Sequence, residues 1–343
     1  MKAIAVMTGG TPVAPNVELI DLPEPEPAPG EVLVATEAAA LNQLDIFVGG
    51  GIPGVERPWP RVTGCDGVGV VERVGEGVDP GWVGRRVILN AAVPDIEPAR
   101  PGILPAGEMF RLVGEHTPGT MAEKFVAPAS NLLEIGGHHE ASAAAAFGLT
   151  HLTAWRMLQT RARVQPGEWV LVTGIGGGVA LASLGICKAL GCRVVVTSRH
   201  QWKLDRAIEL GADAAVLDEG EDWSRAVRAA TDRRGVDLSI DSVGQAIHES
   251  CITALARGGR LVTCGATTGG AARTDLTRVF WNQLSILGST MGTMAEFRAV
   301  TRLFELQTIV PVVDHAGSPA DARGLWERIE QGEQFGKLVV RWG

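Results

Sequence analysis

The sequence predicts an α/β protein in which a β-rich first part precedes a parallel sheet flanked by helices. Three observations support this prediction. Residues 1–135 contain short apolar segments separated by glycine and proline clusters, a pattern typical of strands and turns. From about residue 150, strand-like segments alternate with helical ones, and such alternation predicts βαβ units. The first strand-to-helix turn of this second part is rich in glycine, as expected where the backbone approaches a nucleotide.

The first part is expected to form a partly open barrel. It begins with a strand in the alternating sequence MKAIAV, and further strands are expected at 31–36, 67–74 and 85–90. Residues 22–31 are a connection, because proline cannot join a central strand. Residues 91–108 carry four prolines and two glycines without an apolar period, and we expect a lobe or long surface loop there.

The second part is expected to form a parallel sheet. Its strands are expected at 169–173, 193–198, 214–218, 236–241 and 259–265, and its helices at 178–190, 201–210, 223–233 and 247–255. Gly191 and Gly211 are expected to end the first two of these helices.

Composition excludes several classes of function. The net charge of −8 is spread along the chain, so nucleic acid and anionic membranes are not expected as partners. No apolar run reaches the roughly 18 residues that span a bilayer, and the alternating apolar stretch at the N-terminus is too short for the apolar region of a signal peptide. We therefore expect a cytoplasmic location.

Cysteine and tyrosine usage narrows the chemistry. The five cysteines include no CxxC pair, which argues against a disulfide framework and a zinc ribbon. The chain contains no tyrosine. A tyrosine hydroxyl therefore cannot serve as proton donor, as it does in short-chain dehydrogenases and aldo-keto reductases.

The glycine-rich turn VTGIGGGVALAS indicates a dinucleotide site. It lies between an expected buried strand and an expected helix, where backbone N–H groups and the positive end of the helix can approach a pyrophosphate. It does not match G-x-G-x-x-G fully, because Val179 stands at the third glycine position. The residues expected to contact the cofactor are Gly174, Gly177, Gly178 and Val179. The alternative interpretation is an ordinary tight turn.

The end of the second strand favours NADP(H) over NAD(H). An NAD site usually has an acid there to accept from the ribose 2′-hydroxyl. This chain instead has Ser198 and Arg199, with Lys203 one helical turn further on. A hydroxyl and two cations suit a 2′-phosphate, and His200 lies beside Arg199. The alternative is a solvated basic start of a helix.

Several segments together resemble the medium-chain dehydrogenase/reductase superfamily over nearly the whole chain. They include PEPEPAPGEVLV, GCDGVGVVERVGEGV, LTHLTAWRML, KLDRAIELGAD and FGKLVV. The resemblance implies a GroES-like β-barrel catalytic domain at 1–150. It also implies a Rossmann domain at 151–290, with a doubly wound parallel six-stranded sheet that binds NADP(H), and a C-terminal return to the catalytic domain at 291–343. It further implies a homodimer or tetramer that pairs through residues near 284–291.

The resemblance also bears on metal binding. Zinc members of the superfamily place ligands at positions that here hold Asn42, Cys65 with Asp66, and Leu149. One thiol and one short carboxylate are too few for catalytic zinc, which needs three protein ligands. The structural zinc lobe corresponds to residues 91–108, which contain no cysteine. The chain therefore looks like the zinc-free, quinone oxidoreductase-like branch, and no metal is expected.

Catalytic roles follow from this likeness. Hydride delivery to an α,β-unsaturated carbonyl leaves an enolate, whose oxygen needs hydrogen-bond donors. Asn42 is the expected donor and Asp45 is expected to fix its loop, although Asn42 could equally be an ordinary turn residue. Phe47 and Cys65 are expected to line the substrate pocket, and solvent is expected to supply the proton.

For the cofactor, the resemblance implies further contacts from loops elsewhere in the chain. Thr153 is expected on the nicotinamide side, and Lys337 near the phosphates. The loops after the fourth and fifth strands are expected to contribute Ser242, Val243, Gly265 and Ala266.

Three functions remain open at this point. The leading one is a zinc-independent, NADPH-dependent oxidoreductase that reduces a quinone or an α,β-unsaturated carbonyl. The second is an alcohol dehydrogenase of the same superfamily. The third is a nucleotide-binding protein with little catalysis.

Overall fold

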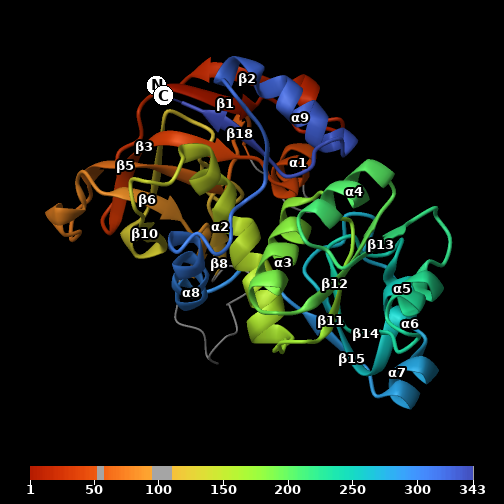
Figure 1. The fold of residues 1–343 in the computed structure, drawn as a ribbon. Helices are drawn as coiled ribbons and strands as arrows, with labels where there is room; N and C mark the ends of the chain where they lie inside the picture. The colour runs from red at the N-terminus through yellow and green to blue at the C-terminus, as the bar shows by residue number, and fades with distance from the viewer. Residues whose placement is uncertain (52–57, 95–109, 343) are drawn as a thin grey trace. The chain divides into compact units, whose positions relative to one another are not determined.

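The computed structural model describes residues 1–51, 58–94 and 110–342, and the chain divides into two compact units. Unit 1 comprises Met1–Leu149, Gly292–Glu305 and Val310–Gly343, and unit 2 comprises Thr150–Met291 and Leu306–Ile309. Unit 1 therefore combines strands from both ends of the chain, β1 (Lys2–Val6) and β18 (Lys337–Arg341) (Figure 1).

Unit 1 is built mainly from antiparallel strands. Its largest sheet has the order β10-β6-β5-β3-β18-β17, and β9 pairs with β3 in addition. The bounds are β3 (Glu31–Ala40), β5 (Asp66–Val74), β6 (Arg86–Leu89), β9 (Lys124–Pro128), β10 (Leu132–Glu134) and β17 (Val313–Gly317). The smaller sheets contain β2 (Val17–Asp21), β1 and β4 (Arg61–Val62), and β7 (Ala92–Pro94) with β8 (Phe110–Leu112).

The helices of unit 1 cover this β structure. They are α1 (Gln43–Gly50), the first part of α2 (Ala141–Trp155), α8 (Met294–Glu305) and α9 (Ala322–Gln331). Helix α9 buries Leu325, Trp326 and Ile329, a spacing that places all three on one face. This face packs on Ile4 of β1 and Leu338 of β18 within one hydrophobic core.

Unit 2 is a six-stranded parallel sheet with the order β13-β12-β11-β14-β15-β16 (Figure 1). The strands are β11 (Trp169–Val172), β12 (Arg193–Ser198), β13 (Ala214–Leu217), β14 (Val236–Asp241), β15 (Leu255–Thr263) and β16 (Ser285–Gly288). The helices are α3 (Gly178–Ala189), α4 (Gln201–Glu209), α5 (Ser224–Ala230), α6 (His248–Ala254) and α7 (Leu276–Asn282). From β11 the chain first adds β12 and β13 on one side of the sheet and then β14, β15 and β16 on the other side. Dinucleotide-binding sheets have the same change of side. The predicted fold class is confirmed.

Two boundaries in unit 2 differ from the sequence prediction. Helix α5 ends at Ala230 because Asp232 and Arg233 both adopt positive φ, which a helix does not allow. Strand β15 begins at Leu255, directly after α6, because that residue is already extended.

The structure also shows two features that the sequence did not predict. Helix α2 continues as a π-helical segment over Arg156–Arg161, which the sequence pattern did not predict. Of the expected loop at 91–108, only residues 91–94 are described, and Ala92–Pro94 form β7; residues 95–108 lie outside the described residues. Within the described chain, no helix is long and apolar enough to cross a membrane.

Candidate functional site

Three neighbouring strands of unit 1 bring a polar cluster together at one end of the sheet. Strand β3 ends at Ala40, which pairs with Asp66 at the start of β5 and with Val339 near the start of β18. Both pairings are antiparallel, so the carboxyl end of β3 meets the amino ends of its two neighbours. Asn42, Asp66 and Lys337 therefore lie close together although they are far apart in the sequence.

The side chains of this cluster are joined by hydrogen bonds and are almost completely buried. Lys337 Nζ donates to Asp66 Oδ2 at 2.8 Å and also to Asn42 Oδ1. Asn42 Nδ2 donates to Asp66 Oδ2 at 2.8 Å and to Cys65 Sγ at 3.3 Å. Because an ammonium can only donate, the Lys337 contact fixes which end of the Asn42 amide is oxygen. We refer to Asn42, Cys65, Asp66 and Lys337 as the lysine cluster.

The second carboxylate oxygen of Asp66 is held by the backbone of α2. It accepts from Leu149 N at 2.5 Å. A Cβ at Gly148 would lie 2.6 Å from this oxygen, so a glycine is needed for α2 to approach. Both oxygens of Asp66 are thus engaged, one with α2 and one with the lysine cluster.

Asp45 ties the loop of Asn42 to the loop before Cys65. Its carboxylate accepts from Asn42 N at 2.8 Å and from Gly64 N at 2.7 Å, and Asn42 caps α1 in return. Burial raises the pKa of Asp45 to about 6, although both N–H groups oppose this shift. Asp45 thus holds its loop, as predicted from the sequence.

Cys65 is buried and unsuited to act as a thiolate. Burial raises the pKa of its thiol well above the usual value, and the carboxylates of Asp45 and Asp66 raise it further. A thiol in this state is a poor nucleophile.

In unit 2, the glycine-rich turn has the conformation that close approach of a phosphate requires. Gly174 and Gly176 have φ values of 62° and 114°, which favour glycine. Gly177 caps α3 without a side-chain hydrogen bond, so the first N–H groups of this helix can bind an anion. The turn fits a pyrophosphate.

The basic residues after β12 differ in their surroundings. Lys203 is buried with its stem against the turn, because a Cβ at Gly176 would meet Lys203 Cδ at 2.8 Å. Arg199 is exposed. Ser198 is buried, and its Oγ accepts from His200 N at 3.2 Å. No acid stands between Ser198 and Lys203.

The loop after β14 depends on Asp241, whose role the sequence analysis missed. Its carboxylate accepts from Val243 N at 2.7 Å and from Gly244 N at 3.1 Å, and burial raises its pKa. This arrangement fixes the loop of Ser242 and Val243. The signal in the sequence was an acid at the end of a buried strand, directly before a glycine-containing loop.

Three further expected cofactor positions, Gly265, Ala266 and Thr153, lie at a close approach of two loops or are buried. An added Cβ at Gly265 would lie 3.1 Å from Ser242 O, so the loops after β14 and β15 approach closely. Ala266 follows Gly265 in the second loop and lies close to Gly244. The hydroxyl of Thr153 is buried without a hydrogen-bond partner in the described part of the chain, which is costly unless a ligand supplies one.

Comparison with known proteins agrees with these two units. Residues 28–137 match the family model of the alcohol dehydrogenase GroES-like domain, and residues 178–305 match that of the zinc-binding dehydrogenases. The chain is 32% identical over 332 residues to the zinc-type alcohol dehydrogenase-like protein YogA of Leptosphaeria maculans, covering 92% of each chain. The chain belongs to the medium-chain dehydrogenase/reductase superfamily.

Solved structures of medium-chain dehydrogenases and reductases resemble the whole chain. One, described as an NAD-dependent alcohol dehydrogenase, has 37% identity and a TM-score of 0.91, with 100% of both chains covered. Another is the cobalt- and zinc-bound thermostable alcohol dehydrogenase of Pyrobaculum aerophilum, with 31% identity, a TM-score of 0.88, and 100% and 99% of the chains covered. The protein is therefore an oxidoreductase of the alcohol dehydrogenase-like type.

The lysine cluster does not fit the catalytic zinc of this superfamily. Leu149 offers no donor side chain and Asn42 offers only an amide, so Cys65 and Asp66 are the only two side chains of this set that are usual zinc ligands. Asp66 already bonds Lys337, Asn42 and Leu149 N. A dication beside the Lys337 ammonium would also meet like-charge repulsion. The side chains of the lysine cluster therefore do not make up the three-ligand set that catalytic zinc needs.

Two predicted site residues have surroundings that the sequence did not indicate. Lys337 was expected near the cofactor phosphates, but its ammonium is bonded to Asp66 and Asn42 inside unit 1. Phe47, which was expected to line the substrate pocket, lies on α1 with 43% of its surface exposed. Cys65, in contrast, is buried in the lysine cluster.

One group of described residues outside the lysine cluster has metal-ligating donors close together. His138, His139 and Glu305 have donor atoms within 4.8 Å of one another. His139 Nε2 lies 3.2 Å from Glu305 Oε1, and the His139 ring stacks on Phe304. These contacts join α8 to the loop before α2. The same donor atoms form a group that could hold an adventitious metal ion.

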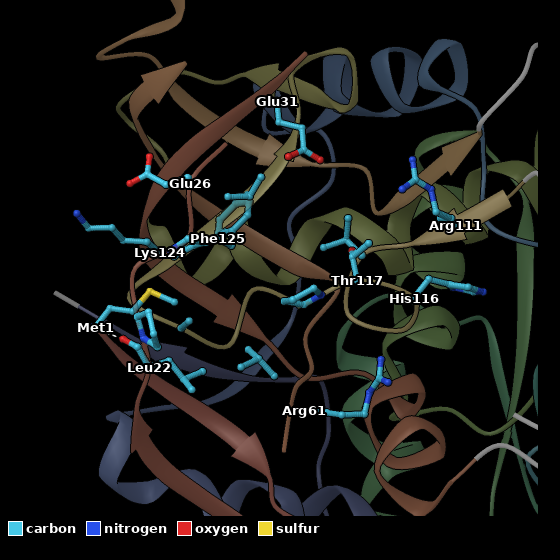
Figure 2. Close-up of a pocket in the computed structure, with 18 of the residues that line it drawn as sticks. Met1, Leu22, Glu26, Glu31, Arg61, Arg111, His116, Thr117, Lys124 and Phe125 are labelled. Carbon is cyan, nitrogen blue, oxygen red and sulfur yellow. Dashed lines mark hydrogen bonds between the residues drawn. The ribbon is translucent and has the colours of Figure 1, made fainter. Parts of the chain in front are cut away.

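A cavity of about 710 Å³ lies elsewhere in unit 1, and Figure 2 shows it in close-up. Its charged lining includes Arg61 and Lys124, which are already engaged. Arg61 donates to Glu115 O, and Lys124 pairs with Glu24 and Glu72. None of the predicted site residues lines this cavity, and it carries no argument about the reaction.

Proposed function

We propose that the protein is a zinc-independent, NADPH-dependent reductase of α,β-unsaturated carbonyls or quinones. The observation that carries the proposal is the lysine cluster, in which a buried ammonium is bonded to Asp66 and Asn42. By the resemblance described above, these two residues stand at positions where zinc members of the superfamily have metal ligands. Carbonyl reduction requires a positive or hydrogen-bonding group at the oxygen, where negative charge develops. A site without metal ligands can meet this requirement only with protein donors.

The residues of unit 2 fit NADP(H), which would supply the hydride. The turn of Gly174, Gly177, Gly178 and Val179 would hold the pyrophosphate, and the loops after β14 and β15 would hold the nicotinamide half. Arg199 and Lys203 supply charge for a 2′-phosphate, with Ser198 between strand and helix. The relative described as NAD-dependent makes NADH the competing cofactor.

The competing function is alcohol dehydrogenation, because both the curated relative and the solved structures carry alcohol dehydrogenase names. Enones and quinones are favoured because hydride addition to them places charge on an oxygen without requiring a strong Lewis acid. A saturated carbonyl is harder to reduce without metal.

The test is a paired activity screen. Oxidation of NADPH and of NADH is followed with enones, quinones, saturated aldehydes and ketones, before and after treatment with a chelator. The proposal predicts oxidation of NADPH by an enone or quinone that the chelator does not change. Binding of NADPH without oxidation by any of these acceptors would favour the nucleotide-binding alternative.

We further propose that two copies of the chain associate through strand β16. It lies at one edge of the sheet of unit 2, where unpaired backbone groups can pair with a second strand. Ile286 of β16 and Phe280 and Trp281 of α7 are exposed large apolar side chains near this edge. A second copy of the same edge would cover them symmetrically.

A further inference from the structure

The donors of Asn42 are used within the lysine cluster. Its amide has two hydrogens, and Nδ2 already lies at 2.8 Å from Asp66 Oδ2, 3.3 Å from Cys65 Sγ and 3.4 Å from Ala40 O. A donation to a substrate oxygen would require Asn42 to break its bond to a buried carboxylate. Asn42 is therefore a positioning residue.

One N–H donor of the Lys337 ammonium has no hydrogen-bond partner within the described residues. An ammonium carries three N–H groups, and two of them have partners, Asn42 Oδ1 and Asp66 Oδ2. Within residues 1–51, 58–94 and 110–342, the third has no partner. An unpaired donor on a buried cation is costly, and buried groups of this kind are otherwise nearly always satisfied.

The cluster holds the ammonium in place before any substrate arrives. Asp66 anchors it and is itself anchored by Leu149 N of α2, while Asn42 is anchored by Asp45. Side chains from β18, β5 and the start of α1 thus converge on one charge. A preorganised charge that is shielded from bulk water stabilises a developing anion more strongly than a solvated one.

We infer that Lys337 is a catalytic residue whose third N–H group and positive charge stabilise the negative charge that develops on the substrate oxygen. This inference rests on the proposed function and names the electrophile of the same site. It assigns Asn42, Asp66 and Asp45 to positioning.

A bound NADPH would supply the hydride for the β-carbon of the enone. The C=C π bond would break, and its electron pair would place negative charge on the carbonyl oxygen. Lys337 would donate a hydrogen bond to this oxygen, and water would supply the proton for the α-carbon. The enone is reduced by two electrons and the cofactor is oxidised by two.

The test compares the parent protein, which is the reference, with Asp66→Asn combined with Lys337→Met. The double variant removes the ammonium without leaving a buried carboxylate or ammonium unpaired. Thermal unfolding checks that the double variant is folded, and NADPH binding checks that unit 2 still holds the cofactor. Hydride transfer is then measured in a single turnover, and steady-state turnover is measured with NADPH and with NADPH deuterated at the transferred position.

The inference predicts that removal of Lys337 slows hydride transfer by roughly a hundredfold to a thousandfold, as for loss of one oxyanion donor. The deuterium isotope effect on steady-state turnover should rise, because hydride transfer becomes rate-limiting. A structural role would lower only the active fraction. A single-turnover rate constant within a few fold of the reference, with an unchanged isotope effect, would overturn the inference.

The same comparison separates this inference from the proposed function. If the parent protein reduces saturated aldehydes but no enone or quinone, the proposed function is wrong, and the parent protein and the double variant assayed with the aldehyde still decide the role of Lys337. If the parent protein reduces no carbonyl or quinone with either cofactor, both are wrong.

Discussion

Lys337 Nζ lies 2.8 Å from Asp66 Oδ2, and the two side chains are only 4% and 0% exposed. The pair connects the first strand position of β5 with that of β18, across 271 residues of sequence. It is the centre of the lysine cluster and gives rise to the first prediction.

Removal of one partner of this pair should be far worse than removal of both. Lys337→Met leaves a buried carboxylate unpaired and should cost about 3–5 kcal/mol of the free energy of unfolding. Asp66→Asn with Lys337→Met should recover a large part of this loss, because no charge remains and the introduced amide oxygen can still accept from Leu149 N. Denaturant titrations of the three proteins measure the effect. Lys2→Met, which removes an exposed ion pair with Asp21, is the control and should change little; equal losses for Lys2→Met and Lys337→Met would contradict the prediction.

Asp45 should make the protein less stable as pH rises from about 4 to about 6. Burial raises the pKa of Asp45 to about 6 from its usual 3.8, so the folded state binds a proton more tightly than the unfolded state. The stability that this proton contributes is complete below pH 4 and is lost as pH rises through 6, by about 3 kcal/mol at most.

Asp45→Asn should remove this part of the pH dependence. Unfolding free energies of the parent protein and the variant, measured between pH 4 and pH 7, give the difference, in which all other titrating groups cancel. Parallel curves for the two proteins would contradict the raised pKa.

Arg199→Ala should weaken NADPH binding by roughly tenfold to a hundredfold and change NADH binding little, because only NADPH carries the 2′-phosphate. Equilibrium dissociation constants for both cofactors measure this. Arg225→Ala, which removes an exposed arginine from α5, is the matched control for net charge. Equal affinity of the parent protein for both cofactors would refute the NADP(H) assignment.

Ile286→Lys should separate the proposed dimer, since it places a charge on the exposed face of β16. Sedimentation or light scattering should then show a monomer where the parent protein shows a dimer. Leu306→Lys introduces the same charge at another exposed apolar position of unit 2 and should leave the dimer intact. If both variants remain dimeric, the interface lies elsewhere.

The sequence predicted the parts of the molecule that depend on neighbouring residues. Strands β11 to β14 lie on the apolar segments from which they were predicted. Gly191 and Gly211 lie just beyond the ends of α3 and α4 and have positive φ, as is common for glycine at the end of a helix. The turn at Gly174 was recognisable for the same reason, since its conformation depends on the glycines themselves.

The sequence could not predict the partner of Lys337. The bond to Asp66 depends on the register of β3 with both β5 and β18, and no local pattern reveals such a register. The sequence also could not show that the N–H donors of the Asn42 side chain are already used within the protein. Their acceptors, Asp66 and Cys65, are 24 and 23 residues away in the sequence. Asp45 was placed correctly because its main partner, Asn42, is three residues away.

Lys337 is proposed to stabilise the negative charge on the substrate oxygen in place of a metal ion, and this is tested most directly by measuring zinc content and turnover together. The chain with His138→Gln and His139→Gln, which removes the described group most able to hold adventitious metal, is dialysed against a chelator, and its zinc content and NADPH-dependent turnover are measured on the same sample. The account predicts full turnover with far less than one zinc per chain. Turnover that falls in proportion to zinc content and returns when zinc is added would contradict it.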